Sequence, residues 1–205
     1  MKSYPSITKD INPYARIYAF DKLDGSNIRG EWNNKKGFYK FGSRHTLIDE
    51  NTPTLGKSIS ILKEKFEKDL SIVFKKNNWK DVVCFFEFYG ENSFAGQHLD
   101  TEEQTLTLID VAPFNKGILE PLDFIREFGH LNIPPVLFIG QVTEEFIDSV
   151  KNSTLKDMGV EGVVCKGAND KKTKMPIMFK IKSKAWLDKV KNYCNGNNEL
   201  FEKLI

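Results

Sequence analysis

The spacing of apolar residues along the chain predicts a fold that contains both strands and helices. Runs typical of strands occupy residues 15–22, 26–33, 37–43, 81–89, 105–112, 160–166 and 176–182. From residue 56 to residue 77, apolar side chains recur at steps of three and four, which predicts one amphipathic helix with its apolar face in the core. Because strands outnumber helices while both recur, we expect an α+β fold of mostly antiparallel sheets flanked by helices.

Weaker patterns define the remaining segments. The polar residues 1–14 predict an N-terminal arm, and the turn at residues 33–37 predicts that the strands on either side pair as a hairpin. Short helices are expected at 121–129 and 143–152, an apolar stretch at 135–142, and a helical tail at about 184–204 that breaks at Asn195-Gly196. No repeat or linker interrupts the chain, so we treat residues 1–205 as a single domain.

The composition is typical of a globular protein and disfavours several functional classes. Hydrophobic residues make up 40% of the chain and charged residues 28%, and no apolar run approaches the length of about 20 residues that spans a membrane. The first residues lack the apolar segment of a secretory signal. Three widely spaced cysteines form no metal-binding pattern, so we expect packing roles for them in a reducing, cytoplasmic compartment.

The net charge of +2 conceals two blocks of opposite sign. Residues 100–148 contain ten acidic and two basic side chains, whereas residues 166–191 contain nine lysines and two aspartates. A basic block of this kind is consistent with a solvated face and equally with a surface that binds a phosphate-rich partner. Composition alone leaves both interpretations open.

Several charged residues interrupt segments that the pattern predicts to be buried. Glu87 lies within an apolar run, Glu161 and Lys166 flank Gly-Val-Val-Cys, and Lys180 and Lys182 should project from one face of their strand. Buried charges are costly and persist when they are paired or functional. Taken singly, Glu87 is also consistent with an edge strand, and the two lysines with the solvent face of an amphipathic strand.

The end of the first predicted strand concentrates unusual chemistry. Lys22 is followed by the carboxylate of Asp24 and by Gly25, a residue that permits a tight turn and the close approach of a bulky ligand. An amine attacks an electrophile only when it is deprotonated, so a nucleophilic lysine needs a lowered pKa. Lys180, Lys182 and a metal ion would supply the cations that lower it.

Together these charges suit a nucleoside triphosphate that is bound with a divalent cation. Lysines offset phosphate charge, and carboxylates hold Mg²⁺ or Mn²⁺ directly or through water. The candidate phosphate ligands are Lys22, Lys166, Lys180 and Lys182, and the candidate metal ligands are Asp24, Glu87 and Glu161.

Five motifs, in chain order, resemble those of the covalent nucleotidyltransferase superfamily of polynucleotide ligases and mRNA capping enzymes. They are Lys22-Leu23-Asp24-Gly25, Ser43-Arg44, Phe86-Glu87-Phe88-Tyr89-Gly90, Glu161-Gly162-Val163-Val164-Cys165-Lys166 and Phe179-Lys180-Ile181-Lys182. A single Lys-x-Asp-Gly is a weak signal, but five motifs in order are not expected by chance. Asn27, Ser43-Arg44 and the stretch from Glu87 to His98 resemble the RNA ligase branch that is typified by bacteriophage RNA-repair enzymes.

The resemblance implies an ATP-grasp-like nucleotidyltransferase (adenylation) domain and assigns roles to the matching residues. Lys22 would be the nucleophile, and Lys180 and Lys182 would hold the α-phosphate. The strand at 105–112 has no aromatic residue where the family places a base-stacking one, so an aliphatic side chain and Val164 would form the base pocket. The implied ATP-binding set is Asp21, Lys22, Asn27, Arg44, Glu87, Glu161, Val164, Lys166, Lys180 and Lys182, with Asp24, Glu87 and Glu161 for Mg²⁺ or Mn²⁺.

The implied reaction is the ATP-dependent joining of RNA ends. Lys22 would be adenylylated, AMP would pass to an RNA 5′-phosphate, and a 3′-OH would then displace AMP. Only 23 residues follow Lys182, so we expect no OB-fold, and the basic block or an accessory protein would supply nucleic-acid binding. The bacteriophage resemblance adds a virus- or phage-encoded origin as an expectation.

Other functions remain open at this stage. A DNA ligase and a GTP-dependent capping enzyme share the same motifs, and a catalytically silent module that binds a nucleotide or RNA would keep the same pocket. The three histidines, His45, His98 and His130, are scattered, and we expect structural or surface roles for them rather than metal binding, although His45 and His98 are close enough to motif residues to line a substrate groove.

Overall fold

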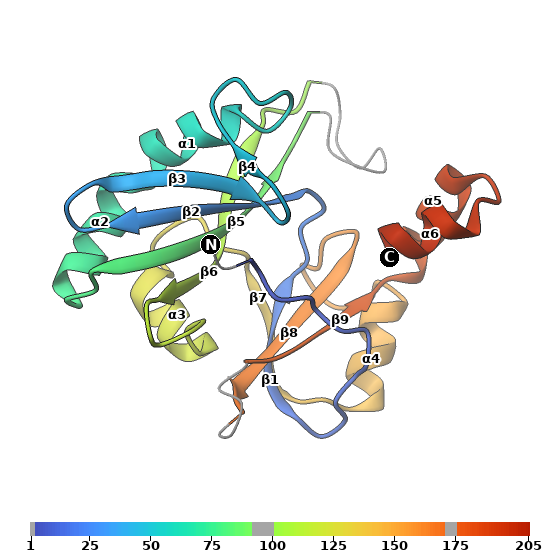
Figure 1. The fold of residues 1–205 in the computed structure, drawn as a ribbon. Coiled ribbons are helices and arrows are strands. Elements are labelled where there is room, and N and C mark those ends of the chain that lie inside the picture. Colours follow the sequence, from blue (N-terminus) through green and yellow to red (C-terminus); the bar gives the residue numbers. More distant parts are fainter. Residues whose placement is uncertain (1–2, 92–100, 171–175) are drawn as a thin grey trace.

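The protein contains two antiparallel β-sheets with helices packed around them (Figure 1). The computed structural model describes residues 3–91, 101–170 and 176–205. In spatial order, the four-stranded sheet consists of β7 (Val136–Gln141), β1 (Arg16–Asp21), β8 (Gly162–Asn169) and β9 (Pro176–Lys182). The five-stranded sheet consists of β4 (Leu47–Ile48), β3 (Gly37–Ser43), β2 (Ser26–Asn33), β5 (Asp81–Tyr89) and β6 (Thr105–Pro113). The predicted α+β class is therefore confirmed.

Six helices accompany the sheets in the described part of the chain. They are α1 (Lys57–Lys65), α2 (Glu67–Lys76), α3 (Pro121–Phe128), α4 (Glu144–Lys151), α5 (Lys184–Cys194) and α6 (Asn198–Leu204). The break expected at Asn195 is confirmed, because this residue adopts a left-handed conformation with φ 43° and ends α5. All named strands belong to the two sheets, so the described residues form no separate OB-fold.

Two expectations about the elements were wrong or incomplete. The single helix expected at 56–77 is two helices, because Phe66 has φ −123° and separates α1 from α2. The apolar spacing continues across this break, and the Phe66 ring packs edge-on against Phe86 with centroids 5.2 Å apart. The apolar spacing therefore gave no sign of the break between α1 and α2 at Phe66. The apolar stretch at 135–142 forms the edge strand β7.

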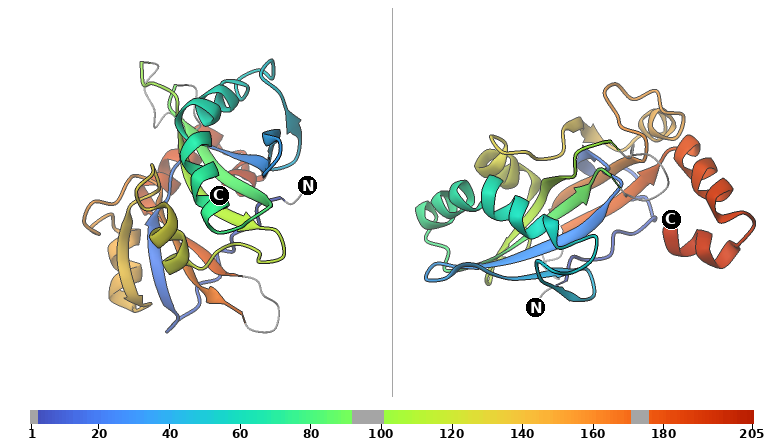
Figure 2. Two further views of the ribbon diagram at one scale, coloured as in Figure 1. Left: turned by 90° about the vertical axis from the view of Figure 1, so that its left-hand side faces the viewer. Right: turned by 90° about the horizontal axis from the view of Figure 1, so that it is seen from above.

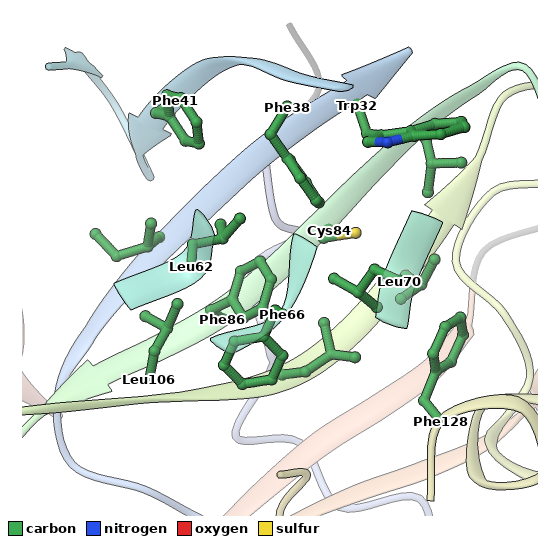
Figure 3. Packing of buried hydrophobic residues seen from close by; sticks show 14 of the residues in the cluster. Trp32, Phe38, Phe41, Leu62, Phe66, Leu70, Cys84, Phe86, Leu106 and Phe128 are labelled. Atoms are coloured by element: carbon green, nitrogen blue, oxygen red, sulfur yellow. The ribbon is translucent and has the colours of Figure 1, made fainter. Parts of the chain in front are cut away.

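The larger hydrophobic core lies between the five-stranded sheet and the helices α1, α2 and α3 (Figure 3). Aromatic rings fill much of this core. The ring centroids of Trp32 and Phe74 are 5.0 Å apart, and those of Phe124 and Phe128 are 5.7 Å apart. Each fully buried side chain of this size contributes roughly 1.5–3 kcal/mol through removal of its apolar surface from water. The abundance of Phe in the sequence thus supplies much of the apolar surface that this core buries.

Besides this core, the described residues form three smaller clusters, two of which contain helical residues. The first packs Phe146 and Val150 of α4 against residues of β1, β8 and β9. The second joins α5 to α6 through Trp186, Val190 and Cys194. Figure 2 shows these two helices at one end of the molecule, next to the four-stranded sheet. None of the described helices is long and apolar enough to cross a membrane.

Candidate active site

The candidate site lies where the chain passes from one sheet to the other. Strand β1 ends at Asp21 and β2 begins at Ser26, so the connection that carries Lys22 and Asp24 joins the two sheets. A pocket of about 760 Å³ opens at this connection. Its lining includes the complete set of predicted site residues: Asp21, Lys22, Asp24, Asn27, Arg44, Glu87, Glu161, Val164, Lys166, Lys180 and Lys182.

Two glycines allow the elements around the pocket to approach closely. A Cβ atom on Gly25 would lie 2.4 Å from the carbonyl oxygen of Phe88. The sequence suggested that Gly25 makes room for a bulky ligand. In the structure, strand β5 occupies the space next to Gly25. Gly162 has φ +133°, and a Cβ there would lie 2.1 Å from the carbonyl oxygen of Ile181. Gly25 and Gly162 thus allow close approach of β5 and β9 at the pocket.

Glu161 connects the two ends of the chain by binding two lysines. Its Oε2 lies 2.8 Å from Nζ of Lys22, and its Oε1 lies 2.8 Å from Nζ of Lys182. The Glu161 side chain is 4% exposed, so both charge-assisted bonds are shielded from water. The Lys22 amide also donates to the carbonyl oxygen of Gly162 at 2.9 Å. The backbone and the side chains therefore place the Lys22 amine beside the Glu161 carboxylate.

The surroundings of Lys22 raise the pKa of its amine and so favour the protonated form, whereas neighbouring cations were expected to lower this pKa. Burial by itself lowers the pKa of Lys22, but the charges of Glu161 and Glu87 outweigh it and raise the pKa above the ordinary value. The sequence identified the lysines near Lys22 but did not indicate that a carboxylate stands between them. Lys22 must lose this proton before it can act as a nucleophile.

The pKa values of Lys180 and Lys182 are shifted in the opposite direction, below their ordinary value. Burial lowers the pKa of Lys182 to about 8, and the positive charge of Lys22 also disfavours its ammonium form. Burial and the charge of Lys22 lower the pKa of Lys180 as well. Both amines contact the end of α6: Lys180 donates to the carbonyl oxygen of Ile205 at 2.6 Å, and Lys182 to that of Leu204 at 3.5 Å. A phosphate group bound by these lysines would displace the two carbonyl oxygens.

Lys166 lines the pocket but is engaged by the protein itself. Its Nζ lies 2.8 Å from Oδ2 of Asp110 and donates to the carbonyl oxygen of Ile109 at 2.7 Å. The hydroxyl of Tyr4, in the N-terminal arm, donates to the same Asp110 oxygen. Sequence analysis did not single out Asp110 or Tyr4, although Asp110 interrupts an apolar strand in the same way as Glu87.

Glu87 belongs to an interior strand, so the edge-strand interpretation is wrong. It stands in β5, which pairs with β2 on one side and β6 on the other, and it lies directly opposite Asn27. Burial raises the pKa of Glu87 to about 7. The Asn27 Oδ1 atom is buried, and within the described residues it has no hydrogen-bond partner. An unpaired polar atom in the pocket suits a donor group on a ligand.

The remaining predicted residues occupy the edges of the pocket. Asp21 accepts a hydrogen bond from the amide of Gly159 at 2.8 Å and so anchors the segment before Glu161. Arg44 is exposed in the turn after β3. Val164 and Ile109 both line the pocket, and their role as walls of a base pocket stays a prediction.

The histidines occupy different surroundings. His45 lines the pocket, and His130 is exposed after α3. His98 lies outside the described residues.

The three candidate metal ligands surround one pocket but are not assembled as a metal site. Across residues 3–91, 101–170 and 176–205, no group of three or more His, Cys, Asp or Glu side chains is positioned to hold a metal ion. The reason is visible for Glu161, whose two oxygens bind lysines. Asp24 in turn accepts a hydrogen bond from the indole of Trp186 at 3.4 Å. A divalent cation would need these contacts to rearrange.

Trp186 is a site residue that the sequence did not indicate. Its ring lies 3.7 Å from Nζ of Lys182, measured to the ring centroid, and the side chain is fully buried. It follows Lys182 by four residues, beyond the last motif. A tryptophan in an amphipathic helix is ordinarily a core residue, so its contact with the motifs could not be inferred from its spacing.

The fold is similar to that of RNA ligases of known structure. An RNA ligase from Naegleria gruberi with pyrophosphate matches with a TM-score of 0.66 at 17% identity, over 94% of this chain and 58% of that one. A variant of that ligase with ATP and Mn gives 0.64 at 18% identity, over 92% and 60%, and another with AMP and Mn gives 0.63 at 18%, over 87% and 52%. The chain thus spans between half and three-fifths of these proteins. Neither a protein-family model nor a curated protein matches the sequence.

The raised pKa of Glu87 predicts a specific pH dependence of stability. Because the folded protein holds this proton more tightly than the unfolded chain, the free energy of unfolding falls as the pH rises from about 4.5 to about 7. Glu87→Gln removes this contribution, which is roughly 3 kcal/mol. The stability of Glu87→Gln relative to the unsubstituted protein should therefore rise between about pH 5 and about pH 8, as measured by urea unfolding with EDTA. A difference that does not change with pH would contradict this prediction.

Proposed function

We propose that this protein is an ATP-dependent RNA ligase whose Lys22 forms a covalent bond to AMP. The observation that carries the proposal is the Lys22–Glu161–Lys182 arrangement, with a buried carboxylate between two partly buried lysines, in a pocket at the junction of two sheets. The similarity to RNA ligase structures supports the same class of chemistry. On this proposal residues 1–205 act as a single adenylation domain.

In the first step, Nζ of Lys22 attacks the α-phosphorus of ATP and the bond to the β-phosphate breaks, which releases pyrophosphate. Oε2 of Glu161, at 2.8 Å, is positioned to accept the Lys22 proton. Lys180 and Lys182 bind the phosphate oxygens and stabilise the charge that develops on them. A divalent cation held by Asp24, Glu87 or Glu161 would offset phosphate charge and favour the neutral amine of Lys22.

The nucleotide would use the remaining groups of the pocket. Asn27 offers an unpaired acceptor atom, and Val164 with Ile109 offers apolar walls for the base. Arg44 is exposed at the pocket edge, where it can contact a phosphate of ATP or of an RNA end. The engaged side chain of Lys166 supports a structural role in the pocket in addition to any phosphate contact.

The later steps transfer AMP to an RNA 5′-phosphate and then join this end to a 3′-OH, with release of AMP. The RNA ends are the proposed substrates. Since the chain spans only part of its structural relatives, we propose that the basic residues 166–191 or an accessory protein contribute to RNA binding.

The first test is to incubate the protein with ATP labelled at the α-phosphate and with Mg²⁺ or Mn²⁺. We expect a label that stays attached to the protein after denaturation. In the native protein, added pyrophosphate should release this label. GTP in place of ATP, and nicked DNA in place of nicked RNA, test the capping-enzyme and DNA-ligase alternatives. The proposal is wrong if ATP binds without forming an adduct, which is the behaviour of a silent nucleotide-binding module.

A further inference from the structure

We infer that Trp186 is a positioning residue for the proposed adenylylation, because it holds Lys182 and Asp24 at the same time. This inference rests on the proposed function. The two contacts join the Lys-Leu-Asp-Gly motif, near the start of the chain, to the Lys-Ile-Lys motif near its end. Trp186 lines the pocket wall, but its partners are protein groups, so its role is exerted through them.

The position of Trp186 is set by the way α5 begins. Ser183 is the N-cap of α5, and its Oγ accepts a hydrogen bond from the amide of Trp186 at 3.1 Å. The same Oγ donates to the carbonyl oxygen of Val160 at 2.6 Å, and the Ser183 amide donates to that of Glu161 at 2.9 Å. The first turn of α5 is therefore bonded directly to the segment that carries Glu161.

The indole ring determines where the ammonium group of Lys182 points. A lysine side chain has several rotatable bonds, and holding it in one orientation costs conformational entropy. With Nζ 3.7 Å from the ring centroid and 2.8 Å from Oε1 of Glu161, the ammonium lies between an aromatic face and a carboxylate. The aromatic face attracts the cation and excludes water on that side. An aliphatic side chain would fill the same space without this attraction.

The indole N–H of Trp186 contacts the Lys-Leu-Asp-Gly motif. It donates to Oδ2 of Asp24 at 3.4 Å, and Asp24 is two residues after Lys22 in the connection between the sheets. A single rigid side chain therefore sets the separation between Asp24 and Lys182, the groups on either side of the proposed reaction centre. Preorganisation of this kind affects the rate of the chemical step more than it affects the binding of the nucleotide.

Two substitutions separate the aromatic face from simple packing. Trp186→Phe keeps a ring beneath Lys182, whereas Trp186→Leu keeps an apolar side chain without an aromatic face. Val190→Ala is the matched control, since Val190 is buried in the same cluster on the same helix. The measurements are the rate of labelled adduct formation at saturating ATP, the KM for ATP and the thermal unfolding midpoint, all on the full chain.

We expect Trp186→Leu to slow adduct formation at saturating ATP by roughly tenfold or more, while the KM for ATP changes by less than about threefold. Trp186→Phe should give a rate between those of Trp186→Leu and the unsubstituted protein, because it keeps the ring beneath Lys182 but loses the hydrogen bond to Asp24. Val190→Ala should lower the unfolding midpoint without slowing the reaction below that midpoint.

The inference is overturned if Trp186→Leu reacts as fast as the unsubstituted protein, or if Val190→Ala slows the reaction as much as Trp186→Leu does. The second result would mean that Trp186 acts only through the stability of the α5–α6 cluster. If the unsubstituted protein forms no adduct, the proposed function fails and this inference fails with it. If the unsubstituted protein forms the adduct but the variants give either of the results above, only this inference fails.

Discussion

Lys22→Arg should abolish formation of the AMP adduct, with a loss of at least about a thousandfold, while the protein stays folded. A guanidinium group remains protonated at any pH at which the protein is folded, so it cannot attack a phosphorus atom. Arginine nevertheless keeps the positive charge next to Glu161, which is buried and already binds Lys182. We therefore expect loss of chemistry without the destabilisation that an unpaired buried carboxylate would cause.

The adduct is measured by denaturing electrophoresis after incubation with α-labelled ATP. Lys63→Arg is the matched control, because Lys63 also lies 2.8 Å from a glutamate, Glu50, but on the protein surface. This control should form adduct at the rate of the unsubstituted protein. Persistence of the adduct in Lys22→Arg, mapped to a different residue by digestion and mass spectrometry, would show that Lys22 is not the nucleophile.

Asp110→Ala should lower the free energy of unfolding by about 3–5 kcal/mol, the range expected when one partner of a buried ion pair is removed. The Asp110 side chain is 1% exposed and that of its partner Lys166 is 6% exposed. The substitution leaves the ammonium of Lys166 buried without its counter-charge and removes the carboxylate acceptor of the Tyr4 hydroxyl. Urea unfolding near neutral pH measures the change.

Asp123→Ala is the control for this prediction. Asp123 lies 2.8 Å from Arg126, but both side chains are largely exposed, so its loss should cost no more than about 1 kcal/mol. Adding Lys166→Met to Asp110→Ala should restore part of the stability, because it removes the uncompensated charge. Equal effects of Asp110→Ala and Asp123→Ala would contradict the view that the Asp110–Lys166 pair is a desolvated pair that supports the pocket.

Much of the fold followed from local patterns. The strands at 26–33, 37–43, 81–89 and 176–182 have the predicted bounds, because their apolar runs end at turn residues that are visible in the sequence. The single helix expected at 56–77 was wrong at Phe66, since an apolar residue at a kink preserves the helical spacing. Periodicity reports which face is buried and is insensitive to a local change in one φ angle.

The candidate site was predicted as a set of residues but not as an arrangement. The residues named from the motifs all line one pocket, and this could be anticipated because charges in apolar strands need partners. Their pairing could not be anticipated. Glu161 was assigned to a metal and binds two lysines, and Lys166 was assigned to phosphate and binds Asp110. Tyr4 and Trp186, which complete these networks, lie outside the motifs.

The sequence by itself determined the mixed fold class, the positions of most strands, and the set of charged residues that need partners, because each of these depends on local spacing and on the cost of burying charge. Only the tertiary structure decided which charges meet. Residues 22, 161 and 182 come together because β1, β8 and β9 are neighbours in one sheet, and Asp24 reaches Trp186 because α5 begins beside Glu161. The protonation states follow from those distances, since the pKa of Lys22 depends on a carboxylate 2.8 Å away that lies 139 residues later in the chain.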